Sequence, residues 1–216
     1  MAVDAIIIGE SKPQWEERCL ASLSKAQVRI HRCAAVPGST GRARAEALRT
    51  PGLGQVVTFV DPDDWICPDA LHDAEEELAL YPEVDAVYTN ELLVNEEGIP
   101  FQRSTSTGVP WSKSWQVSHI GGVHHLVLYR LAKLLPLLQL LDTWHVVELY
   151  LLHAALAGIG KLRHVDTTGY YWRIHSGGVH SQISISDRLA AVRLATQLAY
   201  GKLNGCCHST WALGLG

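Results

Sequence analysis

The chain has 216 residues, of which 47% are hydrophobic and 19% charged, with a formal net charge of -4. This length suits one α/β domain rather than two. The negative net charge does not indicate a surface that binds nucleic acid in general, although a local basic groove would be compatible with it. Five cysteines, an odd number, do not make a disulfide framework, so we expect reduced thiols in a cytoplasmic protein.

The first residues lack the basic start and long apolar core of a secretory signal. No apolar run approaches the ~20 residues that a membrane helix needs. We therefore expect a soluble protein without membrane insertion.

The first half of the chain alternates predicted strands and helices, which is the pattern of a doubly wound sheet. Apolar, β-branched runs predict strands, and amphipathic stretches opened by Pro or Gly predict helices. The predicted strands are residues 3–8, 28–36, 55–60 and 85–89, followed by a hairpin over 92–102. The predicted helices are residues 13–25, 38–49 and 68–80.

The second half begins with residues 103–122, which have no periodicity but contain two tryptophans. That combination is typical of a functional lid rather than of plain disorder. Strands are predicted at 123–130, 161–165 and 169–174, and helices at 131–141, 144–157 and 185–203. We expect residues 1–180 to form one doubly wound α/β domain with a mostly parallel sheet, and residues 181–216 to pack on it as a helix and tail.

Three carboxylates within four positions follow the strand predicted at 55–60, namely Asp61, Asp63 and Asp64. In open α/β sheets, ligands bind in the crevice outside the carboxyl ends of the strands. Hard oxygen ligands suit Mg²⁺ or Mn²⁺, which proteins usually hold with one or two carboxylates plus substrate phosphates. An Asp-Pro turn, with Asp64 or Asp69 capping the next helix, would explain the same residues without a site.

Two further segments accompany this acidic strand end. Residues 38–48 read Gly-Ser-Thr-Gly-Arg-Ala-Arg-Ala-Glu-Ala-Leu, and residues 170–180 read Tyr-Tyr-Trp-Arg-Ile-His-Ser-Gly-Gly-Val-His. In order and spacing, the three segments resemble family 2 glycosyltransferases of the GT-A fold, over roughly residues 3–180. The resemblance implies metal-dependent, inverting transfer of a sugar from a nucleotide-diphosphate donor, in the first instance a UDP-sugar. The acceptor would be a hydroxyl of a glycan, a small molecule or a hydroxylated DNA base.

Within this resemblance, Asp63 is the first candidate for a direct metal ligand. Asp61 is expected to contact the ribose or the metal's water, so it is both a nucleotide and a metal candidate, and Asp64 is a further candidate for either task. A third ligand is expected from the aromatic-Arg-X-His segment. It would be His175, or His180 beyond a glycine pair that is free to fold over a diphosphate. Surface or structural histidines are the alternative.

Inverting transfer also needs a general base to take the proton of the attacking hydroxyl. The family places a carboxylate at the start of a late helix, commonly as a Glu-Asp pair. Here only Glu148 lies near that place, and Asp142 is the second candidate. A buried, paired structural role for Glu148 and an N-cap role for Asp142 are the alternatives.

Binding of the nucleotide is expected near the first strand and the glycine-entered helix. By resemblance, Arg42 or Arg44 contacts the nucleotide or its phosphates, although a solvated helix face would explain both. The family's Pro-aromatic-Asn turn after the first strand is replaced here by Gly9-Glu10-Ser11, in which Glu10 could meet the nucleotide.

Two rival functions stay open. A nucleotidyltransferase shares the sheet and the metal chemistry, but usually begins with a Gly-rich phosphate loop, of which Gly9-Glu10-Ser11 is a poor version. A non-catalytic nucleotide- or glycan-binding module has no need of the acidic triplet. His119, His124 and His125 lack cysteines at zinc-finger spacing, so we expect structural or acceptor-side histidines there.

Overall fold

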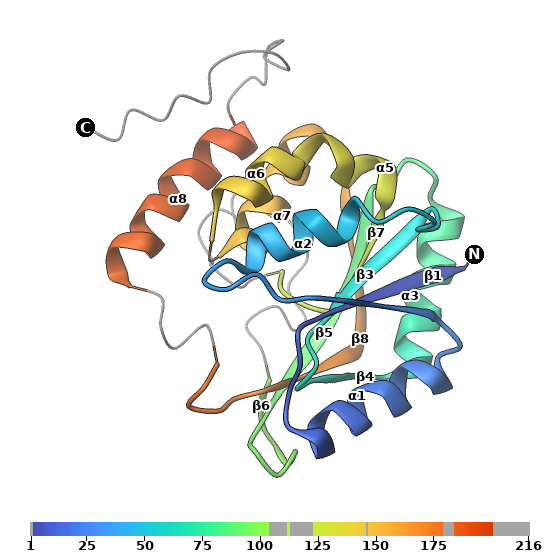
Figure 1. Cartoon of the computed structure of the whole chain (residues 1–216). Helices are drawn as coiled ribbons and strands as arrows, with labels where there is room; N and C mark the ends of the chain where they lie inside the picture. The colour runs from blue at the N-terminus through green and yellow to red at the C-terminus, as the bar shows by residue number, and fades with distance from the viewer. Residues whose placement is uncertain (1, 104–111, 113–122, 146, 179–183, 201–216) are drawn as a thin grey trace.

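The computed structural model describes residues 2–103, 112, 123–145, 147–178 and 184–200, and the structural statements below concern these residues. Eight strands form one sheet in the order β2-β1-β3-β7-β5-β8-β4, with β6 paired to β5. Five of them, β1, β2, β3, β5 and β8, run in the same direction, so the sheet is mostly parallel as predicted. Helices cover both of its faces (Figure 1).

The predicted alternation in the first half is confirmed, with shifts of a few residues at the ends. The elements are β1 (Val3–Ile8), α1 (Pro13–Lys25), β2 (Arg29–Cys33), α2 (Thr40–Leu48), β3 (Val56–Val60) and α3 (Pro68–Leu80). One short strand, β4 (Trp65–Ile66), was not predicted. It pairs antiparallel with β8 and so ties the segment after the acidic turn to the sheet.

The predicted hairpin is also confirmed. Its arms are β5 (Ala86–Val94) and β6 (Pro100–Arg103), and β5 joins the strand and the first hairpin arm that were predicted separately. The side chain of Asn95 closes the turn, because its Oδ1 accepts the peptide N–H of Ile99 at 2.8 Å.

The second half departs more from prediction. Its elements are β7 (Val127–Arg130), α5 (Leu131–Leu134), η1 (Leu135–Leu137), α6 (Leu138–Thr143), α7 (Glu148–Ile159), β8 (Leu162–Arg173) and α8 (Ile185–Tyr200). The single helix predicted at 131–141 was wrong, since three short helical segments replace it. The start predicted for α7 at 144 was wrong as well. Val147 has a φ of 54°, in the left-handed region, so the helix cannot extend upstream through it.

β8 is one strand where two were predicted. The polar residues between the predicted strands read as a break, and the ladder with β5 is irregular there, because its register shifts between Tyr88 and Asn90 before pairing resumes. Asp166 accepts a hydrogen bond from the side-chain amide of Asn90 at 2.8 Å, and Thr168 lies opposite Asn90. A polar side-chain contact therefore bridges the two strands across the irregular middle of β8.

Two apolar layers lie on opposite faces of the sheet, because side chains alternate along each strand. Ile6 and Phe59 pack with α2, α6 and α7, whereas Ile7 and Val60 pack with α1 and α3. Figure 1 shows these helix groups on opposite sides of the strands. A third apolar cluster joins α7 to α8. Among the described helices, none has both the length and the apolar character needed to cross a membrane.

Candidate active site

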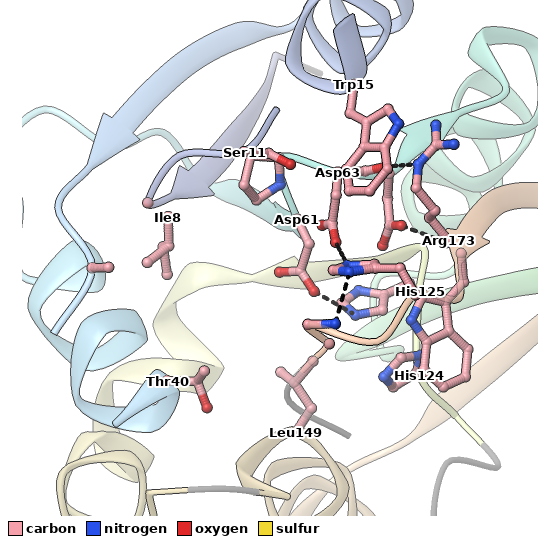
Figure 2. A pocket seen from close by; sticks show the side chains of 18 of the residues that line it. Ile8, Ser11, Trp15, Thr40, Asp61, Asp63, His124, His125, Leu149 and Arg173 are labelled. Carbon is pink, nitrogen blue, oxygen red and sulfur yellow. Dashed lines mark hydrogen bonds and ion pairs between the residues drawn. The ribbon is translucent and has the colours of Figure 1, made fainter. Parts of the chain in front are cut away.

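A cavity of about 900 Å³ lies at the carboxyl ends of β1 and β3. Its walls come from the segment after β1, the N-terminal part of α2, the acidic turn after β3, the start of α7 and the end of β8. Figure 2 shows side chains from these elements around one space. The predicted crevice at the strand ends is therefore present.

The acidic turn Asp61-Pro62-Asp63-Asp64 connects β3 to β4. The peptide N–H of Asp64 donates to the carbonyl of Asp61 at 3.1 Å, which closes the turn. Cys67, not an aspartate, is the N-cap of α3, and no side chain caps that helix. The alternative in which these acids serve as a helix cap is therefore not what the structure shows.

Asp63 is bonded to His175, which the chain supplies from just beyond β8. The Oδ2 atom of Asp63 lies 2.7 Å from Nε2 of His175, and the peptide N–H of Gly177 donates to Nδ1 of the same ring at 3.2 Å. Because Nδ1 accepts, the proton of the neutral ring sits on Nε2 and is donated to Asp63. Burial and the charge of Asp61 raise the pKa of Asp63, while the bond from His175 opposes this shift.

Asp64 turns into the protein. It is 1% exposed, and its Oδ1 accepts the peptide N–H of Arg173 at 2.7 Å. Burial, with the charges of Asp63 and Asp61, raises its pKa well above the ordinary value. The bond fastens the acidic turn to the end of β8.

Arg173 secures the same turn from another side. Its Nε donates to the carbonyl of Asp63 at 2.8 Å, and its Nη1 donates to the carbonyl of Asn95 at 3.2 Å and to that of Glu96. The guanidinium also lies 4.7 Å from the ring centroid of Trp15. In the sequence, Arg173 stands out only as part of the aromatic-Arg-X-His pattern, whereas in the structure it joins the acidic turn to the β5–β6 hairpin.

A buried charge cluster lies beneath Asp61. The guanidinium of Arg44, 5% exposed, bonds to Oδ1 of Asp61 at 3.1 Å through Nη2 and to the carboxylate of Glu148 through Nη1. Burial lowers the pKa of Arg44, but the charges of Glu148 and Asp61 outweigh it, so the pKa is raised. Glu148 is itself 4% exposed and is the first residue of α7.

The glycine entry of α2 explains how Arg44 reaches this cluster. A Cβ on Gly41 would lie 2.0 Å from the carbonyl oxygen of Trp144, so only glycine allows the helix to pack this closely. The peptide N–H and the hydroxyl of Thr40 both donate to the carbonyl of His145, at 3.1 and 3.0 Å. The start of α2 is thereby fixed against the segment that leads into α7.

The remaining candidates are scattered. Glu10 is exposed and lines the cavity after β1. Arg42 pairs with Glu46 on the outer face of α2 at 3.2 Å and does not line the cavity.

Asp142 lies within α6, also outside the cavity lining, and pairs with Arg49 at 3.0 Å. The N-cap alternative for Asp142 was wrong, because Val147 is the N-cap of α7. His180 and most of the predicted lid lie outside the described residues.

Two adjacent histidines line the cavity below Asp61 (Figure 2). His125 is buried against Tyr170, with ring centroids 4.5 Å apart, and its Nε2 lies 3.7 Å from Oδ2 of Asp61. Burial lowers its pKa well below the ordinary value. Nδ1 of His124 lies 3.2 Å from a carboxylate oxygen of Glu91, and its ring lies against Trp172 at 4.5 Å.

The strand order, the helices on both faces and the acidic turn at the carboxyl edge define a GT-A-like domain, the fold of family 2-like glycosyltransferases. The similar solved structures include S. aureus TarS, a glycosyltransferase of this type. TarS 1-349 in complex with UDP superposes with a TM-score of 0.65 and 17% identity, covering 91% of this chain and 64% of that one. The complex with UDP-GlcNAc gives a TM-score of 0.63, also at 17% identity, with 91% and 66% covered.

The chain thus spans less than two thirds of the first of these TarS structures, and 39% of a longer one. At this identity, the likeness establishes the fold. No family model matches the sequence. No curated protein matches it either.

Proposed function

We propose that the protein is a metal-dependent, inverting glycosyltransferase that uses a nucleotide-diphosphate sugar, with UDP as the nucleotide. The observation that carries the proposal is the pairing of Asp63 with His175 on the wall of a cavity of about 900 Å³. TarS, which shares the fold, has been solved with UDP and with UDP-GlcNAc. A donor of that class is the simplest occupant of this cavity.

Asp63 and His175 are the groups that would hold Mn²⁺ or Mg²⁺. The described residues contain no cluster of three or more His, Cys, Asp and Glu side chains arranged for a metal ion. Two protein ligands nevertheless fit a cation that takes its other ligands from the donor's phosphates and from water, as Mg²⁺ commonly does. Such a cation supplies positive charge where the departing diphosphate becomes negative.

The nucleotide would lie on the side of Asp61 that faces β1 and α2. Ile8, Ser11 and Thr40 line this side of the cavity in Figure 2. We assign to Asp61 a contact with the ribose, and to Glu10 a contact with the nucleotide at the rim. Arg44 holds Asp61 in place from below, and Asp64 anchors the turn. Arg42, which is exposed and does not line the cavity, has no role in this proposal.

The attacking hydroxyl must lose a proton. Glu148 is the base that the family resemblance proposes, with Asp142 as its alternative. Of the two, only Glu148 lines the cavity, and there it neutralises Arg44.

Release of UDP from a panel of UDP-sugars, with and without Mn²⁺, tests the proposal against its rivals. A glycosyltransferase releases UDP only with the cation present, slowly to water and faster with the right acceptor. A nucleotidyltransferase instead releases pyrophosphate from a nucleoside triphosphate, and a binding module binds UDP without turnover. Adding oligosaccharides, small alcohols or hydroxymethylated DNA in separate reactions identifies the acceptor class.

A further inference from the structure

The carboxylate of Glu148 is already engaged in an ion pair within the protein. This carboxylate and the guanidinium of Arg44 are both buried and are bonded to each other. The next residue of α7 is Leu149, whose apolar side chain also lines the cavity. The start of α7 therefore offers no second carboxylate to accept a proton.

We propose that His124 is the general base of this site and that Glu91 is its positioning residue. This inference rests on the proposed glycosyl transfer and assigns one step of it. Both residues line the cavity, and Glu91 is 1% exposed whereas the His124 side chain is 23% exposed. The pair thus combines a buried carboxylate with an imidazole that solvent, and hence a substrate, can reach.

The contact with Glu91 determines which ring nitrogen is free to act. Nδ1 of His124 lies 3.2 Å from Oε2 of Glu91, and an ionised carboxylate can only accept a hydrogen bond. The neutral ring therefore carries its proton on Nδ1, and Nε2 keeps its lone pair. A base oriented by a third group in this way is the arrangement that general-base catalysis requires.

The position of His124 suits the acceptor side of the cavity. Its ring lies 4.2 Å from that of His125, which in turn lies below Asp61. In Figure 2, His124 is on the opposite side of Asp61 from Ile8 and Thr40, where the nucleotide is proposed to lie. Trp172 packs against the ring of His124 and adds an aromatic wall there.

Three charged groups act on His124, one from β5, one from the acidic turn and one from α2. Burial lowers the pKa of His124, and the positive charge of Arg44 on α2 lowers it further. The charge and hydrogen bond of Glu91 on β5, together with the charge of Asp61 after β3, outweigh both effects, so the pKa is raised. The other titratable neighbours are His125 and His153 of α7. Burial lowers the pKa of both, which leaves them neutral beside His124.

The proton and electron balance is simple. The acceptor oxygen forms a bond to the anomeric carbon of the donor sugar while the bond from that carbon to the diphosphate breaks. The electron pair of the broken bond goes to the diphosphate oxygen. The acceptor's proton passes to Nε2 of His124, and the imidazolium is stabilised by Glu91 until solvent takes the proton.

The test measures UDP release from a UDP-sugar with Mn²⁺ across pH, for the wild type and for His124→Gln, Glu91→Gln and Glu148→Gln. The wild-type rate should fall as pH falls through the raised pKa of His124. His124→Gln should lose about 10²- to 10⁴-fold in kcat, with UDP affinity unchanged. Its rate should also no longer show this fall at low pH, the acidic limb of the pH profile. Glu91→Gln should shift the limb to lower pH, and Glu148→Gln should keep the limb where it is. His72→Gln, at an exposed histidine of α3, is the matched control.

A second variant guards against a purely structural effect. Free imidazole should restore part of the activity of His124→Gly, as it would for a missing base but not for a packing defect. Wild-type rate and pH dependence in His124→Gln, or loss of the acidic limb in Glu148→Gln alone, would overturn the assignment of His124. A wild-type protein that binds UDP but turns over no donor would instead overturn the glycosyltransferase itself, and the base with it.

Discussion

The Nε2 atom of His175 lies 2.7 Å from Oδ2 of Asp63, although the two residues are 112 positions apart in the chain. The pairing of β4 with β8 brings them together, because it places the end of β8 beside the turn that follows β3. The bond from Gly177 then sets the ring's proton on Nε2.

Metal binding by His175 should reverse this tautomer. A cation held by His175 would take the lone pair of Nε2, so the neutral ring would carry its proton on Nδ1, which could then no longer accept the N–H of Gly177. We expect UDP with Mg²⁺ to move the proton from Nε2 to Nδ1, as read from the ring-nitrogen chemical shifts in NMR spectra. UDP alone is the control. A proton that stays on Nε2 at saturating UDP and Mg²⁺ would mean that His175 only holds Asp63 in place.

Asp63→Asn should lower donor turnover by about 10²- to 10³-fold while the protein stays folded, because it removes one electrostatic stabiliser of the departing diphosphate. Turnover of a UDP-sugar and the circular dichroism spectrum are the two measurements. Asp73→Asn, at an exposed carboxylate of α3, should behave as the wild type. Chelation should stop the wild-type enzyme, and Mn²⁺ or Mg²⁺ should restore it. Undiminished turnover in Asp63→Asn would exclude it as a metal ligand.

Arg44→Met should destabilise the fold strongly. It leaves the buried carboxylate of Glu148 without its partner, and breaking a buried ion pair in this way costs about 3–5 kcal/mol of unfolding free energy. Urea denaturation measures the change. Arg42→Met, at an exposed position on the same helix, should stay within about 0.5 kcal/mol of the wild type.

The double variant Arg44→Met/Glu148→Met should recover part of that loss, since no uncompensated glutamate then remains. If Arg44→Met unfolds at the same urea concentration as Arg42→Met, the cluster does not contribute to stability.

His153 should make the protein sensitive to acid. Its Nδ1 lies 2.9 Å from the carbonyl of Val123 and its Nε2 lies 2.6 Å from the hydroxyl of Tyr129, and burial lowers its pKa to about 3. The folded pKa lies below the unfolded value, so between those two values the unfolded chain binds one more proton. Stability is therefore fully present above pH ~6.5 and falls by about 1.4 kcal/mol per pH unit below it.

Urea denaturation of the wild type and of His153→Gln at several pH values isolates this contribution. Buried Asp64 has a raised pKa and acts in the opposite direction, but it is common to both proteins. The difference in unfolding free energy between them should shrink as pH falls from 7 to 4. The exposed His72→Gln variant should show no such trend. A difference that is constant with pH would show that His153 does not titrate on unfolding.

The sequence predicted the parts of the fold that repeat a simple period. Strands such as β1 and β3 are continuous apolar runs, and their ends follow from where the apolar residues stop. It failed where a distant partner decides the local conformation. In the polar middle of β8, Asp166 accepts a hydrogen bond from Asn90 of β5, and no local pattern shows that contact.

The same limit applies to the site. The sequence marks Asp63 and His175 as candidates, because each lies in a recognisable motif at the end of a predicted strand. The sequence does not show how the environments of the three aspartates differ. Asp64 differs from Asp63 through its bond to the backbone of Arg173, and Glu148 differs from a free carboxylate through its bond to Arg44. Both depend on contacts between elements about a hundred residues apart.

The clamp that Arg173 places on the carbonyls of Asp63 and Asn95 has a thermodynamic consequence. The acidic turn is held by strands on both sides and by this guanidinium, so its shape is set when the chain folds. The nucleotide proposed to bind there would meet groups already in position, and the loss of conformational entropy on binding would fall mainly on the ligand. Affinity at this turn should therefore depend chiefly on how stiff the donor is and on how readily its phosphates shed water.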